Sequence, residues 1–373
     1  MTEGPPTAAP AAPRPPTTVE WVRASTLFFL TLCSVWWSYG FWWRGAAPWT
    51  DPEIALDAAR FAGGMMAIFA AHEAGHYIVA RRHGMEQSLP HFIPFPLAFG
   101  TLGAIIRLRT LPPSRAALLE MGAAGPLAGF VVAIGVLWLG LPGTVEHGLP
   151  ELVTEWPPPD FVPEPSVFDP IWAAADRVLA SEPFASLLGV EEPASMPMMI
   201  MANPSLMDLV GALRLGAPPG RYAELSALGF AGWAGCFLTA MNLLPIGQLD
   251  GGHVVNALLP KHARLIGRIT LGLALLGGML WGGWLFWGLL IWKMGAHRGL
   301  PVDPDGPLTR RAKWVAAAVL IAFVGCFMPQ PFKMEGWSLM DMTVRTPEGV
   351  EVTDAEKRSF LDGLGSATPE DAR

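Results

Sequence analysis

Hydrophobic positions in this chain of 373 residues are gathered into long runs that polar or proline-rich segments separate. A helix rises 1.5 Å per residue, so an apolar run of about 18 residues or more nearly crosses a hydrocarbon layer of about 30 Å. The pattern therefore predicts an all-α polytopic membrane protein with about seven transmembrane helices. The predicted spans are residues 25–43, 61–80, 117–141, 225–244, either one long helix or two short ones within 265–292, and 314–328.

The segment between the second and third runs, residues 84–115, has a different pattern. Pro90, Pro94 and Pro96 exclude a continuous helix, while residues 101–109 are rich in Leu and Ile and favour a strand. Such backbone persists at membrane depth only where protein or water satisfies its polar groups. We expect a small β or re-entrant element here, whose free edge would hold an extended peptide by strand addition. The alternative is an ordinary interfacial loop.

Composition and charge divide the rest of the chain. Residues 1–23 are rich in Pro, Ala and Thr, which predicts a disordered tail. Residues 142–224 hold 12 acidic residues against three arginines, which predicts an acidic extramembrane insertion. The membrane core then consists of residues 24–141 and 225–329, and a C-terminal tail covers residues 330–373.

The overall composition supports a membrane protein. Hydrophobic residues make up 51% of the chain and charged residues 15%, with a mean hydropathy of +0.36. Cys33, Cys236 and Cys326 all lie in apolar runs, so we expect neither a disulfide framework nor a cysteine-type zinc site. We also expect no nucleic-acid partner.

The second apolar run contains a motif that is costly at membrane depth. The stretch 72–76, His-Glu-Ala-Gly-His, has the pattern H-E-x-x-H. Residues four apart project from one helix face, so His72 and His76 can bind one cation, with Glu73 beside them. Ionisable groups inside a membrane helix are expensive and mark functional sites. A catalytic zinc has three protein ligands and one position for water, so a further ligand is required.

Asp250 is the candidate for the third ligand. It belongs to the stretch 242–251, Asn-Leu-Leu-Pro-Ile-Gly-Gln-Leu-Asp-Gly, which follows the fourth apolar run. Pro245 and Gly247 should end the helix and turn the chain so that Asp250 reaches the histidines. The alternatives are histidines satisfied by contacts between helices, and an Asp-Gly-Gly that only ends a helix.

The third apolar run contains regularly spaced glycines. Gly122, Gly125 and Gly129 allow the backbone of a neighbouring helix to approach closely. We expect that neighbour to be the helix with the two histidines.

Together these motifs resemble the site-2 protease family of intramembrane zinc metalloproteases, peptidase family M50. That family pairs H-E-x-x-H on one membrane helix with N-x-x-P-x-x-x-L-D-G on a later one, and this chain matches both. The stretch 125–129, Gly-Pro-Leu-Ala-Gly, is similar to the small-residue motif of the family's intervening helix. Residues 99–107 and 242–252 resemble the branch without a PDZ domain. The likeness covers roughly residues 60–300.

The resemblance implies a zinc metalloendopeptidase that hydrolyses peptide bonds within or near transmembrane segments of membrane proteins, in regulated intramembrane proteolysis. One Zn²⁺ would be bound by His72, His76 and Asp250, with Glu73 as the general base. Asn242 is expected to hydrogen-bond the substrate or the developing oxyanion, or else to be an amide that packs between helices. The implied partners are transmembrane protein substrates and the lipid bilayer.

Short loops rich in Lys and Arg favour the cytoplasmic side of a membrane. Residues 81–115, 261–268 and 293–313 form three such loops, which share one side only if residues 265–292 cross twice. This predicts both motifs near the cytoplasmic side, with the acidic insertion and the C-terminal tail outside. The excess of Arg over Lys and the absence of a Ser- and Arg-rich transit segment favour a bacterial plasma membrane over a plastid.

The main alternative function is a membrane metal transporter or sensor that uses the same ligands. Transport requires ionisable residues in several spans, and the first, third and seventh runs have almost none. A catalytically inactive scaffold is a weaker alternative, because Glu73 is intact.

Overall fold

The computed structural model describes residues 14–143, 145–147, 151–153, 196–202, 204–215, 222–279, 281–293, 303, 306–337, 343–345 and 350–359. The chain divides into two compact units. The larger unit consists of Met1–Val145, Ala202–Pro219 and Ala223–Pro331, and the smaller of Glu146–Met201, Gly220–Tyr222 and Phe332–Arg373. Much of the predicted acidic insertion lies outside the described residues.

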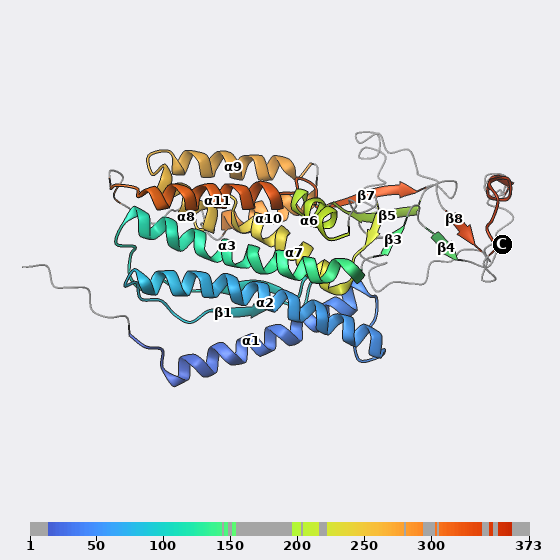
Figure 1. Ribbon diagram of the computed structural model, residues 1–373, viewed down its shortest axis with the longest axis horizontal. Helices are drawn as coiled ribbons and strands as arrows, with labels where there is room; N and C mark the ends of the chain where they lie inside the picture. Colours follow the sequence, from blue (N-terminus) through green and yellow to red (C-terminus); the bar gives the residue numbers. More distant parts are fainter. Residues whose placement is uncertain are drawn as a thin grey trace, which may run out of the picture. The chain divides into compact units, whose positions relative to one another are not determined.

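Helices build the larger unit (Figure 1). α2 packs against α3, and α7 packs against both, so these three helices form the centre of the unit. α1 lies against α2, while α8 and α11 lie against α3. The helices are α1 (Thr18–Ser38), which a π turn (Tyr39–Trp43) extends, α2 (Pro52–Arg82), α3 (Arg115–Gly140), which a 3-10 turn (Leu141–Gly143) follows, α6 (Ser205–Leu215), α7 (Ala227–Asn242), α8 (Asp250–Leu258), α9 (Ala263–Gly277), α10 (Gly282–Lys293) and α11 (Arg310–Cys326).

A capping box determines where α1 begins. The Thr17 hydroxyl accepts a hydrogen bond from the Glu20 N–H, and the Glu20 carboxylate accepts one from the Thr17 N–H. This reciprocal pair satisfies two backbone donors at the helix start. Residues 18–23 are therefore helical, which corrects the prediction of a disordered tail through residue 23. Other helices begin after the capping side chains of Asp51, Ser114, Ser226 and Thr309.

A two-stranded antiparallel sheet lies between α2 and α3. β1 (His91–Pro94) pairs with β2 (Thr101–Ile105), with His91 opposite Ile105 and Phe92 opposite Ala104. β1 also packs against α1, so the first helix covers one side of the hairpin. The predicted β element between the second and third apolar runs is confirmed.

Two of the described helices, α2 and α3, are long and apolar enough to cross a membrane. The predicted run 265–292 is divided between α9, with 15 residues, and α10, with 12. A helix of 15 residues is about 22 Å long, which is shorter than a hydrocarbon core of about 30 Å. The predominantly helical fold is as predicted, but seven membrane-spanning helices are not confirmed.

The smaller unit joins segments that the composition assigned to different parts of the chain. β5 (Met196–Met201) pairs antiparallel with β7 (Phe332–Trp337), and β4 (Glu151–Val153) pairs parallel with β8 (Thr343–Arg345). The predicted insertion and the predicted C-terminal tail thus form common sheets, because strand pairing joins residues far apart in sequence. The short strands where the chain passes from one unit to the other are β3 (Val145–His147) and β6 (Tyr222–Glu224).

Candidate metal centre

The three predicted ligands meet at one point of the larger unit. The Nε2 atoms of His72 and His76, one turn apart on α2, are 3.1 Å from each other. Asp250, the first residue of α8, places Oδ2 3.1 Å from His72 Nε2 and Oδ1 3.2 Å from His76 Nε2. Side chains that are 174 or more residues apart in sequence thus converge as the sequence predicts.

A sharp turn between α7 and α8 brings Asp250 to the histidines. α7 ends at Asn242, and the chain bends through Pro245 and Gly247, whose φ is +42°. Glycine adopts such a φ without the steric cost that other residues meet. An added Cβ at Gly251 would overlap the Leu243 carbonyl, so the start of α8 packs directly on the turn. The predicted helix break before Asp250 is confirmed.

Glycines of α3 allow that helix to pack on the histidines. An added Cβ at Gly125 would overlap the His76 ring, and one at Gly129 would lie 3.2 Å from His72 Cβ. In return, an added Cβ at Gly75 would overlap the Ala124 carbonyl of α3. The prediction that the glycine run packs against the histidine helix is confirmed.

A backbone carbonyl of α3 orients one of the imidazoles. His76 Nδ1 lies 2.8 Å from the Met121 carbonyl oxygen, which can only accept a hydrogen bond. The Nδ1–H of His76 is therefore the donor, and its Nε2 presents a free lone pair toward His72 and Asp250. This is the tautomer that metal coordination through Nε2 requires.

The donor set fits a zinc ion. At bond lengths of about 2.0–2.1 Å, ligands of a tetrahedral zinc lie about 3.3 Å apart, close to the separations of the three donor atoms. Two imidazole nitrogens and one carboxylate oxygen are also ligands that zinc accepts. A fourth position remains for water, because the donors line a cavity of about 500 Å³.

The cavity also brings together the other predicted residues. Glu73, whose exposed fraction is 7%, and Asn242, the last residue of α7, both line it. Residues 102–106 of the β2 strand and its continuation form another wall. His253 lines the cavity too, and the sequence left open whether it supports the metal ligands or only follows the turn. Its spacing of three residues from Asp250 on one helix was the signal that could have identified it.

Comparison with known proteins agrees with this geometry. The model of Peptidase family M50 matches residues 60–277, which is more than half of the chain. The chain belongs to peptidase family M50. The matched region includes both motifs, the hairpin and the glycines of α3.

Several relatives are plant proteins whose names describe probable zinc metalloproteases. The chain is 28% identical over 229 residues to "Probable zinc metalloprotease EGY1, chloroplastic" of Arabidopsis thaliana, covering 61% of this chain and 33% of that protein. The rice protein of that name is 29% identical over 226 residues, covering 59% and 32%. "Probable zinc metalloprotease EGY2, chloroplastic" of Arabidopsis thaliana is 29% identical over 187 residues, covering 50% and 26%. The chain thus spans about a third of the length of these relatives or less. No solved structure matches.

Proposed function

We propose that the protein is an intramembrane zinc metalloprotease of the site-2 type, which cleaves membrane proteins within or near their transmembrane segments. The observation that supports this most strongly is the convergence of His72, His76 and Asp250 at a cavity that Glu73 also lines. The two histidines lie on α2, a helix long and apolar enough to cross a membrane. The M50 membership and the names of the relatives point to the same activity.

Each of these residues has a definite task in the proposed reaction. When bound, zinc acts as a Lewis acid that acidifies water and polarises a carbonyl group. The Glu73 carboxylate accepts the proton of the attacking water and gives it to the leaving amine. Asn242, whose amide can donate from the cavity wall, hydrogen-bonds the substrate carbonyl. Burial of Glu73 limits competing contacts with bulk water.

The hairpin supplies a place for the substrate. One edge of β2 pairs with β1, and residues 102–106 line the cavity. An extended peptide laid along β2 would add a strand and pass the metal centre. A helical peptide bond is already hydrogen-bonded within its helix, so the substrate must unwind before cleavage. Transmembrane segments with helix-weakening residues are therefore the proposed substrates.

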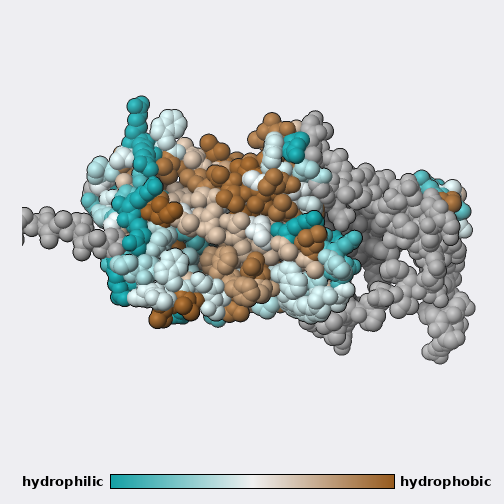
Figure 2. Space-filling view, turned by 60° about the horizontal axis from the view of Figure 1, so that its bottom comes forward, coloured by the Kyte–Doolittle hydropathy of each residue, from teal (hydrophilic) through white to brown (hydrophobic). Residues whose placement is uncertain are grey.

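The surface supports a membrane location with several spans. Figure 2 shows an apolar belt beside a band of hydrophilic residues. On α9, exposed apolar side chains recur on one face, as expected where a helix meets lipid. They are Leu265, Ile269, Leu273 and Leu276. We propose seven spans with the metal centre near the cytoplasmic side. The relatives are named as chloroplastic and do not support a bacterial plasma membrane, which stays a prediction from the excess of Arg over Lys and the lack of a transit segment.

The test is Glu73→Gln in the full chain. We expect zinc content, measured by mass spectrometry of the purified protein, to stay at the parent level, because Glu73 is not among the three ligands. Cleavage of a membrane-helix substrate should be lost, because the base is removed. Glu53→Gln, at the exposed start of α2, is the matched control and should keep both. Zinc uptake into vesicles by a parent protein without peptidase activity would instead identify a transporter.

A further inference from the structure

A second groove, about 390 Å³ in volume, lies between α1 and the β1–β2 hairpin. We call it the α1–hairpin groove. Its size is within the range of about 300–1,000 Å³ that is usual for small-molecule sites. It lies outside the metal centre. Representative side chains on its two walls are Arg23 and Leu27 of α1, Phe92 and Ile93 of β1, and Arg107 and Arg109 of the segment after β2.

The strand continuation after β2 separates the groove from the catalytic cavity. Ile106 and Leu108 line the cavity, whereas Arg107 and Arg109 line the groove. Successive side chains of an extended strand point to opposite faces, so this alternation is what the backbone requires. The backbone holds this register, because the Ser88 N–H donates to the Arg107 carbonyl at 3.0 Å.

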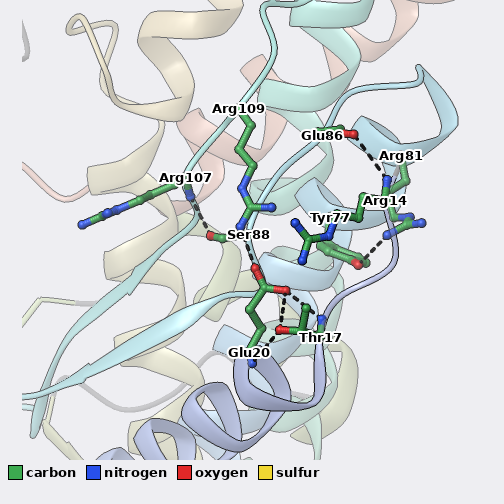
Figure 3. A network of polar contacts seen from close by, with 9 residues as sticks. All are labelled: Arg14, Thr17, Glu20, Tyr77, Arg81, Glu86, Ser88, Arg107 and Arg109. Carbon is green, nitrogen blue, oxygen red and sulfur yellow. Dashed lines mark hydrogen bonds and ion pairs between the residues drawn. The ribbon is translucent and has the colours of Figure 1, made fainter. Parts of the chain in front are cut away.

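The groove contains more positive than negative charge. Glu20 accepts from Arg109 at 2.6 Å and from the Thr17 hydroxyl at 3.1 Å (Figure 3). The hydrogen bond from the Thr17 N–H, together with those from Arg109 and the Thr17 hydroxyl, lowers the pKa of Glu20 to about 2, so it stays ionised and paired. The guanidinium groups of Arg23 and Arg107 have no ion-pair partner among the residues that the structure describes, and both side chains are exposed. Figure 3 shows Arg107 extending away from Glu20.

Both walls of the groove change from charged to apolar in the same direction. At one end the Glu20 and Arg109 side chains form their ion pair. Further along, the rings of Phe28 and Phe92 contact edge to face, with centroids 5.2 Å apart. Further still, the hairpin turn at Gly100 packs on the α1 backbone. An amphiphile with an anionic head and an apolar tail matches this order.

We propose that the α1–hairpin groove binds a phospholipid whose phosphate lies between Arg23 and Arg107 and whose acyl chain lies along Leu27 and Phe92. Arginine recognises phosphate through a planar set of N–H donors. Basic pockets next to an apolar surface are a recurrent setting for lipid head groups. Such a lipid connects α1 to the hairpin that forms a wall of the catalytic cavity. Binding does not depend on peptidase activity.

The experiment measures lipid binding to the full chain in detergent micelles by native mass spectrometry, with phosphatidylglycerol as the probe. We expect phosphatidylglycerol to bind the parent, and to bind Arg23→Gln/Arg107→Gln roughly 10- to 30-fold more weakly. The matched control is Arg264→Gln/Arg268→Gln, which removes two exposed arginines of α9 and should bind like the parent. Arg23→Gln alone, an exposed change on α1, gives a second test with an intermediate loss.

Three outcomes would overturn the proposal. Binding of zwitterionic phosphatidylcholine as tight as that of phosphatidylglycerol would exclude recognition of a net anionic head group. Inorganic phosphate that displaces phosphatidylglycerol at matched concentration would indicate a simple anion site without the apolar contribution. Parent-like affinity in Arg23→Gln/Arg107→Gln would show that the lipid binds elsewhere.

Discussion

Small residues at the contact of α2 and α3 decide whether the two imidazoles can be enclosed. Gly75 and Gly125 each face the opposite helix at a distance that leaves no room for a side chain. Close packing of this kind fixes the histidine rings before a metal binds, so little ordering has to occur on binding. Gly75, the second x position of H-E-x-x-H, is therefore constrained here by helix packing as well as by chemistry.

Gly125→Ala should disrupt the metal centre, because the new methyl group would overlap the His76 ring. We expect zinc affinity to fall on the order of 10- to 100-fold, as when groups that orient a ligand are changed. Gly135→Ala is the control within the same helix, since nothing lies within 4 Å of its added Cβ. That variant should keep zinc affinity and stay within about 1 kcal/mol of the parent in stability. Titration with a competing chelator measures both affinities.

The pairing of Glu20 should make the stability depend on pH. The pKa of Glu20 is lowered to about 2 by hydrogen bonds from Thr17 and Arg109, and Glu20 precedes the apolar run of α1. A lowered carboxyl pKa contributes stability above the unfolded pKa, near 4.5, and this is lost as the pH falls toward 2. Glu20→Gln should lower Tm at pH 7, and its difference from the parent should shrink below pH 4.5. A constant difference at all pH values would exclude the ion pair as the cause.

Among the elements, α8 is short, and its position depends on a residue of another helix. Arg115, the first residue of α3, donates to the carbonyl oxygens of Ala257 at 2.9 Å and Leu258 at 3.0 Å. It also donates to the Gly306 carbonyl at 2.8 Å. The last carbonyls of a helix lack partners within it, and a positive charge there also favours the helix dipole. Arg115 thus anchors the helix whose first residue is Asp250.

Arg115→Met should release the end of α8. We expect a loss of about 1.5–3 kcal/mol in stability, because carbonyls bonded to a charged group lose their partner. Zinc affinity should fall as well, because Asp250 is less well positioned. Arg264→Met, an exposed change on α9, is the control and should alter neither quantity. Loss of stability with unchanged zinc affinity would show that Arg115 supports the fold but not the ligand.

For the molecule as a whole, the number of membrane spans depends on α9 and α10. The two helices pack against each other across a short connection, which fits a hairpin of antiparallel helices. Met279, within that connection, is 89% exposed. Each helix is shorter than an ordinary span, so the seven-span proposal requires this connection to reach the opposite face of the membrane.

Single cysteines at positions 262 and 279 would report the topology. In a background with Cys33, Cys236 and Cys326 replaced, we expect His262→Cys to react with an impermeant reagent from the cytoplasmic face. Met279→Cys should react from the opposite face, since seven spans require α9 to cross. Reaction of both from the same face would contradict the seven-span proposal without affecting the metal centre.

Local spacing accounts for what could be predicted before the fold was known. Residues four apart share a helix face, so the pairing of His72 and His76 follows from the chain itself. Proline and glycine end helices through their own backbone properties, which is why the turn before Asp250 was predictable. The capping box at Thr17 and Glu20 was equally local, and the start of α1 could have been read from it.

Contacts between distant residues carry no such local signature and appear only in the tertiary structure. The pairing of β5 with β7, the bonds from Arg115 to α8 and the ion pair of Glu20 with Arg109 join segments separated by many residues. Many other residues of the chain could form such strand pairs, hydrogen bonds or ion pairs. Only the packing of the folded chain determines which of them meet. The ligands of the metal centre could therefore be predicted from sequence motifs. Only the tertiary structure determines that Arg115 anchors α8 and that α1 and the hairpin enclose a groove.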